Sequence, residues 1–231
     1  MAYCERSHGL NVVGDRLLWG HALSNVYARR HAFRGQFDEA RAMFDRASDS
    51  FRELGSNFGL DDLYANRAQA ELLTGDREAL AILLREAGTW AETTKNVGRG
   101  VLSRFAGDLA YFWAELGDTA EAERWLGMSH PDTDDSRFTL GALLARLRLL
   151  LLRGRRDDAL AGAREAIASD RCRESLDSRA QVLECAADVF DAAGCQDELR
   201  STLDELANAY RRKGNLVGLE RTERRIARLP G

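Results

Sequence analysis

Proline is nearly absent from this sequence, with two residues in 231. A chain of short β-strands needs frequent turn residues, so this scarcity argues against an all-β fold. Alanine, leucine and charged residues dominate instead, and charged residues alone make up 30% of the chain. Such a composition is typical of a globular protein built from helices. It predicts an all-α fold.

Long apolar runs are absent too. The longest, residues 140–152, is interrupted by Arg146 and Arg148, whereas a membrane span needs about 20 apolar residues. The first residues show no positively charged segment followed by an apolar one, which a secretory signal requires. We therefore expect no membrane partner and no export by a signal peptide.

Neither sign of charge prevails, and cysteine is scarce. The 33 basic and 37 acidic residues give a net charge of −4, without the basic excess of a nucleic-acid-binding protein. The four cysteines form no Cys-x-x-Cys pair, so nothing supports a zinc site. Thiols in a chain without an export signal are usually reduced. These features predict a cytoplasmic protein with no direct nucleic-acid partner.

Motifs of the common enzyme classes are missing as well. The only lysines, Lys95 and Lys213, follow no glycine-rich phosphate loop. His21 and His31 lie ten residues apart with no His-Glu-x-x-His motif, which favours packed or surface histidines over metal ligands. Arg137 stands where an acidic calcium loop would have its glycine. We expect neither an enzyme nor a metal or cofactor site.

A repeat of about 40 residues runs through the chain. Its marks are five glycines separated by 40, 42, 37 and 40 residues: Gly35, Gly75, Gly117, Gly154 and Gly194. Acidic residues follow each glycine closely, as at the junction of two helices. The spacing predicts five helical hairpins, each turning at its glycine.

The apolar register after each glycine supports the same repeat. At offsets +5, +9 and +12, fourteen of fifteen residues are apolar, where the 45% apolar composition predicts about seven. Spacings of four and three residues place each trio on one helical face. Seven residues before the glycines stand Ala28, Ala68, Ala110, Leu147 and Ala187. The four alanines among these five residues predict close approaches between helices.

The register predicts one repeat domain over residues 1–231. The expected first helices are 16–34, 57–74, 98–116, 136–153 and 174–193. The expected second helices are 36–54, 76–95, 118–129, 155–169 and 196–213. Five hairpins thus fill residues 15–213, and residues 1–14 are interpreted as the remnant of a preceding helix and its connection. Residues 214–231 are expected to form a capping helix that leaves the repeat register.

These residues resemble the tetratricopeptide repeat. The resemblance lies in a glycine followed by acidic residues, Ala40 at +5 and the Ala-x-x-x-Phe of Ala40 to Phe44. The units are longer than the usual 34 residues, and no proline closes the second helices. Such units, and the ending 210–221, look like the C-terminal tails of large bacterial signalling ATPases that carry nucleotide cyclase or DNA-binding domains. The resemblance implies a right-handed α-solenoid that acts as a regulatory or binding module.

The resemblance also implies that the first helices line a concave groove. Carried over by register, positions thirteen, ten and six before each glycine supply the candidate lining. Its members are Asn25, Arg29, Asp62, Gln69, Arg104, Tyr111, Arg148, Gln181, Glu184 and Asp188. This polar lining of mixed charge suits a peptide or helix of a partner protein better than an apolar small molecule. A merely solvated face is the alternative for any one of these residues.

Three functions remain open at this point. The leading prediction is a non-enzymatic module that binds a protein or peptide segment, in which charge reversal at Arg104 or Arg148 weakens capture and leaves the fold intact. The second is a tail that senses a small-molecule effector for an ATPase, nucleotide cyclase or transcriptional regulator. The third is a homodimer formed through an uncapped N-terminal end.

Overall fold

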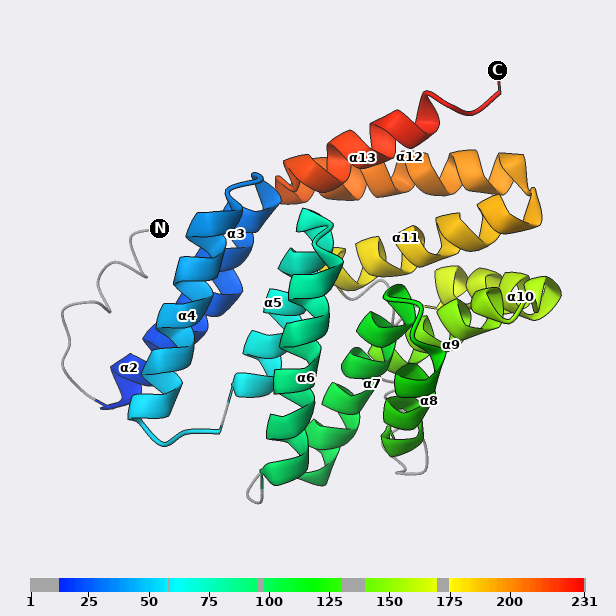
Figure 1. Ribbon diagram of the computed structural model, residues 1–231. Helices are drawn as coiled ribbons and strands as arrows, with labels where there is room; N and C mark the ends of the chain where they lie inside the picture. Colours follow the sequence, from blue (N-terminus) through cyan, green and yellow to red (C-terminus); the bar gives the residue numbers. More distant parts are fainter. Residues whose placement is uncertain (1–12, 58, 95–97, 130–139, 170–174, 231) are drawn as a thin grey trace. The chain divides into compact units, whose positions relative to one another are not determined.

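The computed structural model describes residues 13–57, 59–94, 98–129, 140–169 and 175–230 (Figure 1). Every regular element in these ranges is a helix, and they contain no strand. The prediction of an all-α fold is therefore confirmed. Most of the expected N-terminal remnant, the loop at 130–139, His8 and His130 lie outside the described residues.

Contacts divide the chain into two compact units, Met1–Phe105 and Ala106–Gly231, and the boundary falls inside one helix. We call them the N-terminal unit and the C-terminal unit. The N-terminal unit contains α2 (Val13–Ala22), the π-helical turn η2 (Leu23–Ala28), α3 (Arg29–Phe33), α4 (Phe37–Glu53), α5 (Leu60–Thr74), α6 (Arg77–Thr93) and the start of α7 (Arg99–Glu115). Helix α4 packs on α2, η2 and α3, and also on α5, which in turn packs on α6.

The C-terminal unit continues the same order of helices. It contains the rest of α7, α8 (Thr119–Met128), α9 (Leu140–Leu152), α10 (Arg156–Ala168), α11 (Leu176–Ala193), α12 (Gln196–Lys213) and α13 (Leu216–Ile226). From α8 onward each helix packs on its successor, and α9 also packs on α11, the first helix of the next hairpin (Figure 1). Within this unit, first helices are thus direct neighbours.

The five repeat glycines all occupy the left-handed backbone region. Their φ angles lie between 70° and 80°, which a residue without a Cβ adopts at little cost. At two of these turns the next residue, Asp76 or Asp118, accepts a hydrogen bond from a backbone N–H of the following helix, which caps that helix. The left-handed turn expected from the sequence is therefore present at each repeat glycine, and side-chain capping is present at two of the five.

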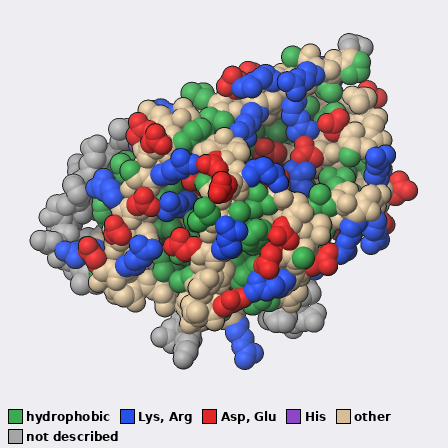
Figure 2. Space-filling model, viewed as in Figure 1, with side chains coloured by type: hydrophobic (Ala, Val, Ile, Leu, Met, Phe, Trp, Pro, Cys, Tyr) green, Lys and Arg blue, Asp and Glu red, His purple; other side chains and the backbone are tan. Residues whose placement is uncertain are grey.

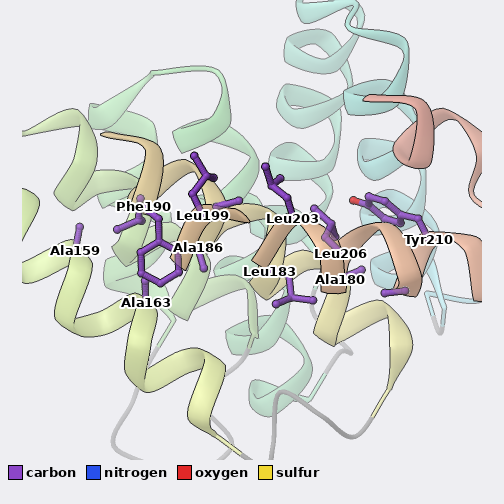
Figure 3. Packing of buried hydrophobic residues seen from close by; sticks show 13 residues of the cluster. Ala159, Ala163, Ala180, Leu183, Ala186, Phe190, Leu199, Leu203, Leu206 and Tyr210 are labelled. Carbon is purple, nitrogen blue, oxygen red and sulfur yellow. The ribbon is translucent and has the colours of Figure 1, made fainter. Parts of the chain in front are cut away.

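The repeat register marks the buried positions of both units. Among the residues at +5, +9 and +12, every one is buried except the half-buried Leu126, and the single polar member, Ser129, is buried at 6% exposure. The five residues at −7 are all buried as well. Figure 3 shows the result in the C-terminal unit, where Phe190 of α11 packs among residues of α10 and α12. Phe190 and Trp113, each four residues before its repeat glycine, are both buried as well.

The expected helices of the five hairpins are present with their ends shifted by at most three residues within the described ranges, whereas the capping helix is shorter than expected and ends at Ile226. One feature was not expected. The first helix contains the π-helical turn η2, where the backbone continues in helical geometry at both junctions. A single extra residue per turn interrupts the 3.6-residue period there, and the change leaves no recognisable mark on the apolar pattern.

Candidate binding face on the first helices

Four charged residues of alternating sign connect the three first helices of the C-terminal unit and α13. The Arg148 Nε of α9 donates a hydrogen bond to Glu115 of α7, and its Nη2 donates one to Asp188 of α11. Arg225 Nη1 of α13 lies 2.7 Å from Asp188 Oδ1. We call Glu115, Arg148, Asp188 and Arg225 the charge ladder. The side chains of the charge ladder join α7, α9, α11 and α13.

The ladder is largely enclosed, and its charges depend on one another. The side chains of Arg148 and Glu115 are 18% and 15% exposed. Burial works to lower the pKa of Arg148, but the carboxylates of Asp188 and Glu115 outweigh it and raise that pKa. Burial raises the pKa of Glu115, and Arg148 opposes this shift. Arg148 therefore stays charged because its neighbours on both adjacent helices carry the opposite charge.

A second carboxyl group, Glu184, sits next to the ladder on α11. The Tyr210 hydroxyl of α12 donates a hydrogen bond of 2.9 Å to its Oε2. Burial raises the pKa of Glu184, the Asp188 carboxylate adds to that shift, and the Tyr210 bond works against it. The adjacent thiol of Cys185 is buried, and burial raises its pKa to about 12. This thiol is therefore protonated and unreactive at neutral pH.

Tyr111 of α7 completes this cluster but is buried, at 6% exposure. Its ring packs at a tilt against Phe112, with the centroids 5.2 Å apart. Burial raises the pKa of its hydroxyl well above the ordinary value, and the charge of Glu115 adds to the shift. Four of the expected lining residues, Tyr111, Arg148, Glu184 and Asp188, are thus brought together. The fifth in this unit, Gln181, is half-buried on α11.

Arg148 corrects two expectations. A merely solvated face was the alternative for this residue, yet Arg148 is mostly enclosed, whereas Arg153 and Arg155 form exposed pairs with Glu123 and Asp158. Charge reversal at Arg148 was expected to leave the fold intact. A glutamate there would face Glu115 and Asp188 in a half-buried site, where like charges strongly destabilise the folded state.

In the N-terminal unit, polar residues of neighbouring first helices also meet. Arg104 of α7 pairs with the buried Asp61 of α5 and lies 3.3 Å from Asp62 Oδ1. Burial raises the pKa of Asp61, the charge of Asp62 adds to it, and Arg104 opposes both. Asn66 of α5 donates a hydrogen bond to Asn25 Oδ1 in the π-helical turn. Arg104 is 48% exposed, so it remains accessible to solvent.

The other two expected residues of this unit lie at intermediate depth. Arg29 places its guanidinium 5.3 Å from the centroid of the Phe33 ring, and burial lowers the pKa of Arg29. Gln69 is half-buried on α5. Asn25, Arg29, Asp62, Gln69 and Arg104 thus belong to the first helices of the N-terminal unit, as the register predicts.

Sequence reasoning missed several partners that complete these contacts. Glu115 stands two residues before Gly117, outside the three offsets that were used, and Arg225 lies beyond the last repeat glycine. Asp61 and Asn66 sit one position from the chosen offsets. The available signal was the excess of charged and polar residues on the first helices. The offset alone does not identify which of them lie across from one another.

The structure offers no arrangement for metal binding among its described residues. No group of three histidine, cysteine, aspartate or glutamate side chains in these ranges has the geometry to hold an ion. His21 packs edge-on against the Phe51 ring, and His31 Nδ1 lies 3.0 Å from Gln36 Oε1. None of the described helices combines the length and apolar character needed to cross a bilayer.

Comparison with known proteins does not assign the chain to a family. No protein-family model matches it, and no curated protein does so either. The arrangement of the first helices is therefore the basis for a functional proposal.

Proposed function

We propose that the chain is a non-enzymatic helical-repeat module that binds a segment of a partner protein along its first helices. In this proposal the hairpins are tetratricopeptide-like, and they stack into a right-handed α-solenoid whose concave side is formed by the first helices. The module would serve as a regulatory part of a bacterial signalling protein in the cytoplasm.

The observation that carries this proposal is the alignment of one register position in the C-terminal unit. Tyr111, Arg148 and Asp188 all stand six residues before their repeat glycine, and they lie on three successive first helices. Arg148 pairs directly with Asp188, and its charge acts on Tyr111. Equivalent positions of adjacent repeats therefore form a continuous row, which is how repeat proteins present an extended surface to a ligand.

The chemistry of this row favours a polypeptide ligand. At and beside the row lie half-buried amide and charged groups, namely Asp188, Gln181 and Arg225, which match the backbone and polar side chains of a peptide. A small-molecule site is instead concave and mainly apolar. Partner binding along the row requires no chemical step, in agreement with the absence of a catalytic motif from the sequence.

Site-specific photo-crosslinking tests this proposal. A photoreactive benzoylphenylalanine replaces Gln69 or Gln181 on first helices, and matched controls carry it at the exposed Arg85 of α6 or Asp204 of α12. In cells that produce the protein naturally, both first-helix positions are expected to trap the same partner protein, and both controls to trap none. Crosslinks formed only from α6 and α12, or no crosslinks at all, would contradict the proposal.

A further inference from the structure

The C-terminal end of the chain has a charge opposite to the rest. Between residues 211 and 228 there are seven arginines and lysines and two glutamates, a net charge of +5. The whole chain carries −4, so the remaining residues together carry −9. Segregation of charge to this degree creates a local positive field in a protein that is acidic elsewhere.

These basic residues form one patch on two packed helices. Arg221 and Arg224 stand three residues apart and share a face of α13, and Arg228 follows two residues after the helix ends at Ile226. Arg211, in the last turn of α12, reaches α13 through a 3.2 Å hydrogen bond to Glu223. We call Arg211, Arg212, Arg221, Arg224 and Arg228 the α13 basic patch. Figure 2 shows basic side chains gathered over α13, near the top of the view.

The patch differs from the charge ladder in how its charges are held. Arg224 and its partner Glu220 are 59% and 69% exposed, and Arg211 and Glu223 are 59% and 55% exposed. Exposed pairs of this kind stabilise a fold by only about 0–1 kcal/mol, so a partner's carboxylates replace them with little loss. Arg225 is instead 30% exposed and held by Asp188, which makes it part of the ladder.

We propose that the α13 basic patch docks an acidic segment of a partner protein. Arginine guanidinium groups bind carboxylates through two parallel hydrogen bonds, and two of them share a face of α13 while a third, Arg228, follows its end. Val217, half-buried one turn before Arg221 on the same face, adds an apolar contact for a side chain of that segment. This surface lies on α13 and the end of α12, so it stands independently of the peptide-binding row proposed above.

The size of the patch favours a short acidic peptide over a nucleic acid. Arg221 and Arg224 lie three residues apart in α13, which is about 5 Å at about 1.5 Å per residue, and Arg228 stands four residues further along the chain. A nucleic acid continues past that distance and meets a chain with nine surplus negative charges beyond the patch. Screening limits that repulsion to about 8 Å at physiological salt, so it acts on the parts of a polyanion that pass close to those charges. A short Glu-rich segment ends before it meets them.

Fluorescence anisotropy with a defined peptide tests this docking. The probe is a labelled peptide of repeated Glu-Glu-Ala units, its control has Gln in place of Glu, and the full chain is titrated at about 50 mM salt. The Glu peptide is expected to bind, the Gln peptide to bind at least about tenfold more weakly, and added salt to weaken the complex. The triple variant Arg221→Glu, Arg224→Glu and Arg228→Glu is expected to lose binding.

A variant with the same change in net charge provides the control. Arg34→Glu, Arg85→Glu and Arg99→Glu reverse three exposed arginines of the N-terminal unit, and they should retain most of the affinity. A second α13 triple with glutamine in place of glutamate, checked by circular dichroism, keeps the test valid if the first variant folds poorly. Equal losses in the α13 and control variants, or tighter binding of a short DNA duplex than of the Glu peptide, overturn the proposal. A dimer in light scattering that the α13 triple variant abolishes would show that a second copy of the chain covers the patch, and this also overturns the proposal.

Discussion

Leu147 of α9 fills the space that a side chain on residue 162 of α10 would occupy. A Cβ added to Gly162 would lie 2.8 Å from Leu147 Cδ2, and Leu147 is 2% exposed. In the other four hairpins the residue at −7 is alanine, and the residue eight positions after the glycine has a side chain: Met43, Leu83, Trp125 and Thr202. This hairpin therefore places its large and small residues the other way round.

This exchange predicts that the effect of Gly162→Ala on the free energy of unfolding changes sign when Leu147 is replaced by alanine. Leu147→Ala should lower the free energy of unfolding by about 2–5 kcal/mol, because it leaves a cavity. Gly162→Ala should cost about 1 kcal/mol in the unmodified protein, because its methyl group overpacks against Leu147. In the Leu147→Ala background the same substitution should instead stabilise, since the methyl group enters the cavity and alanine favours a helix. Urea unfolding measures all four proteins.

The control for this cycle is Gly127→Ala on α8, where an added Cβ meets nothing within 4 Å. It should be neutral or stabilise by up to about 1 kcal/mol in either background. If Gly162→Ala has the same effect with and without Leu147, the two residues do not share the space.

A tighter approach in the C-terminal unit predicts a larger effect. An added Cβ on Gly141 of α9 would lie 2.5 Å from the Asp108 backbone N and 2.6 Å from the Gly107 carbonyl carbon, both on α7. A backbone cannot rotate away as a side chain can, so α7 and α9 would have to separate. We expect Gly141→Ala to lower the free energy of unfolding by about 3 kcal/mol or more. The matched substitution Gly100→Ala, with open space around it, should change it by less than about 1 kcal/mol. Similar values for the two variants would contradict this packing.

The charge ladder predicts that removing Arg148 costs more stability than removing an arginine from an exposed ion pair. Arg148→Ala leaves the enclosed Glu115 and Asp188 carboxylates without their shared counter-charge, so it should cost about 3–5 kcal/mol. Arg124→Ala removes a pair with Glu121 whose side chains are 43% and 38% exposed, and it should cost less than about 1 kcal/mol. Thermal and urea unfolding measure the difference. A loss for Arg148→Ala no greater than for Arg124→Ala would show that the ladder does not stabilise the unit.

The sequence predicts the helices well and their side-chain partners poorly, for a physical reason. Glycines such as Gly75 and Gly194 end helices through their own backbone freedom, so the local sequence is sufficient to predict the turns. The pairing of Arg148 with Glu115 and Asp188 depends instead on the separation and rotation of three helices. Register shows that these positions are close, but one residue along a helix turns a side chain by about 100°. Only the structure therefore shows that Asp61, rather than its neighbour Asp62, is the buried partner of Arg104.

The buried carboxyl group of Glu184 predicts how stability depends on pH. Burial raises its pKa in the folded chain above the ordinary 4.5, so the folded state binds this proton more strongly than the unfolded state. The contribution of Glu184 to stability is then complete below about pH 4.5 and is lost as pH rises through the raised pKa. Glu184→Gln keeps an oxygen that accepts the Tyr210 hydrogen bond but carries no charge. We expect this variant to match the unmodified protein near pH 4 and to be more stable at pH 7, as measured by urea unfolding across that range.

Glu198 provides a control, because its contribution to stability should change with pH in the opposite direction. The hydrogen bond from Arg164 lowers the pKa of this exposed carboxyl group, and burial opposes that shift only in part. A lowered pKa means that the stabilising contribution of Glu198 is present above its ordinary pKa and disappears as pH falls. Glu198→Gln should therefore be slightly less stable than the unmodified protein at pH 7 and equal to it at low pH. If both variants shift stability in the same direction between pH 4 and pH 7, a general charge effect is responsible, and the burial of Glu184 does not determine the pH dependence of this unit.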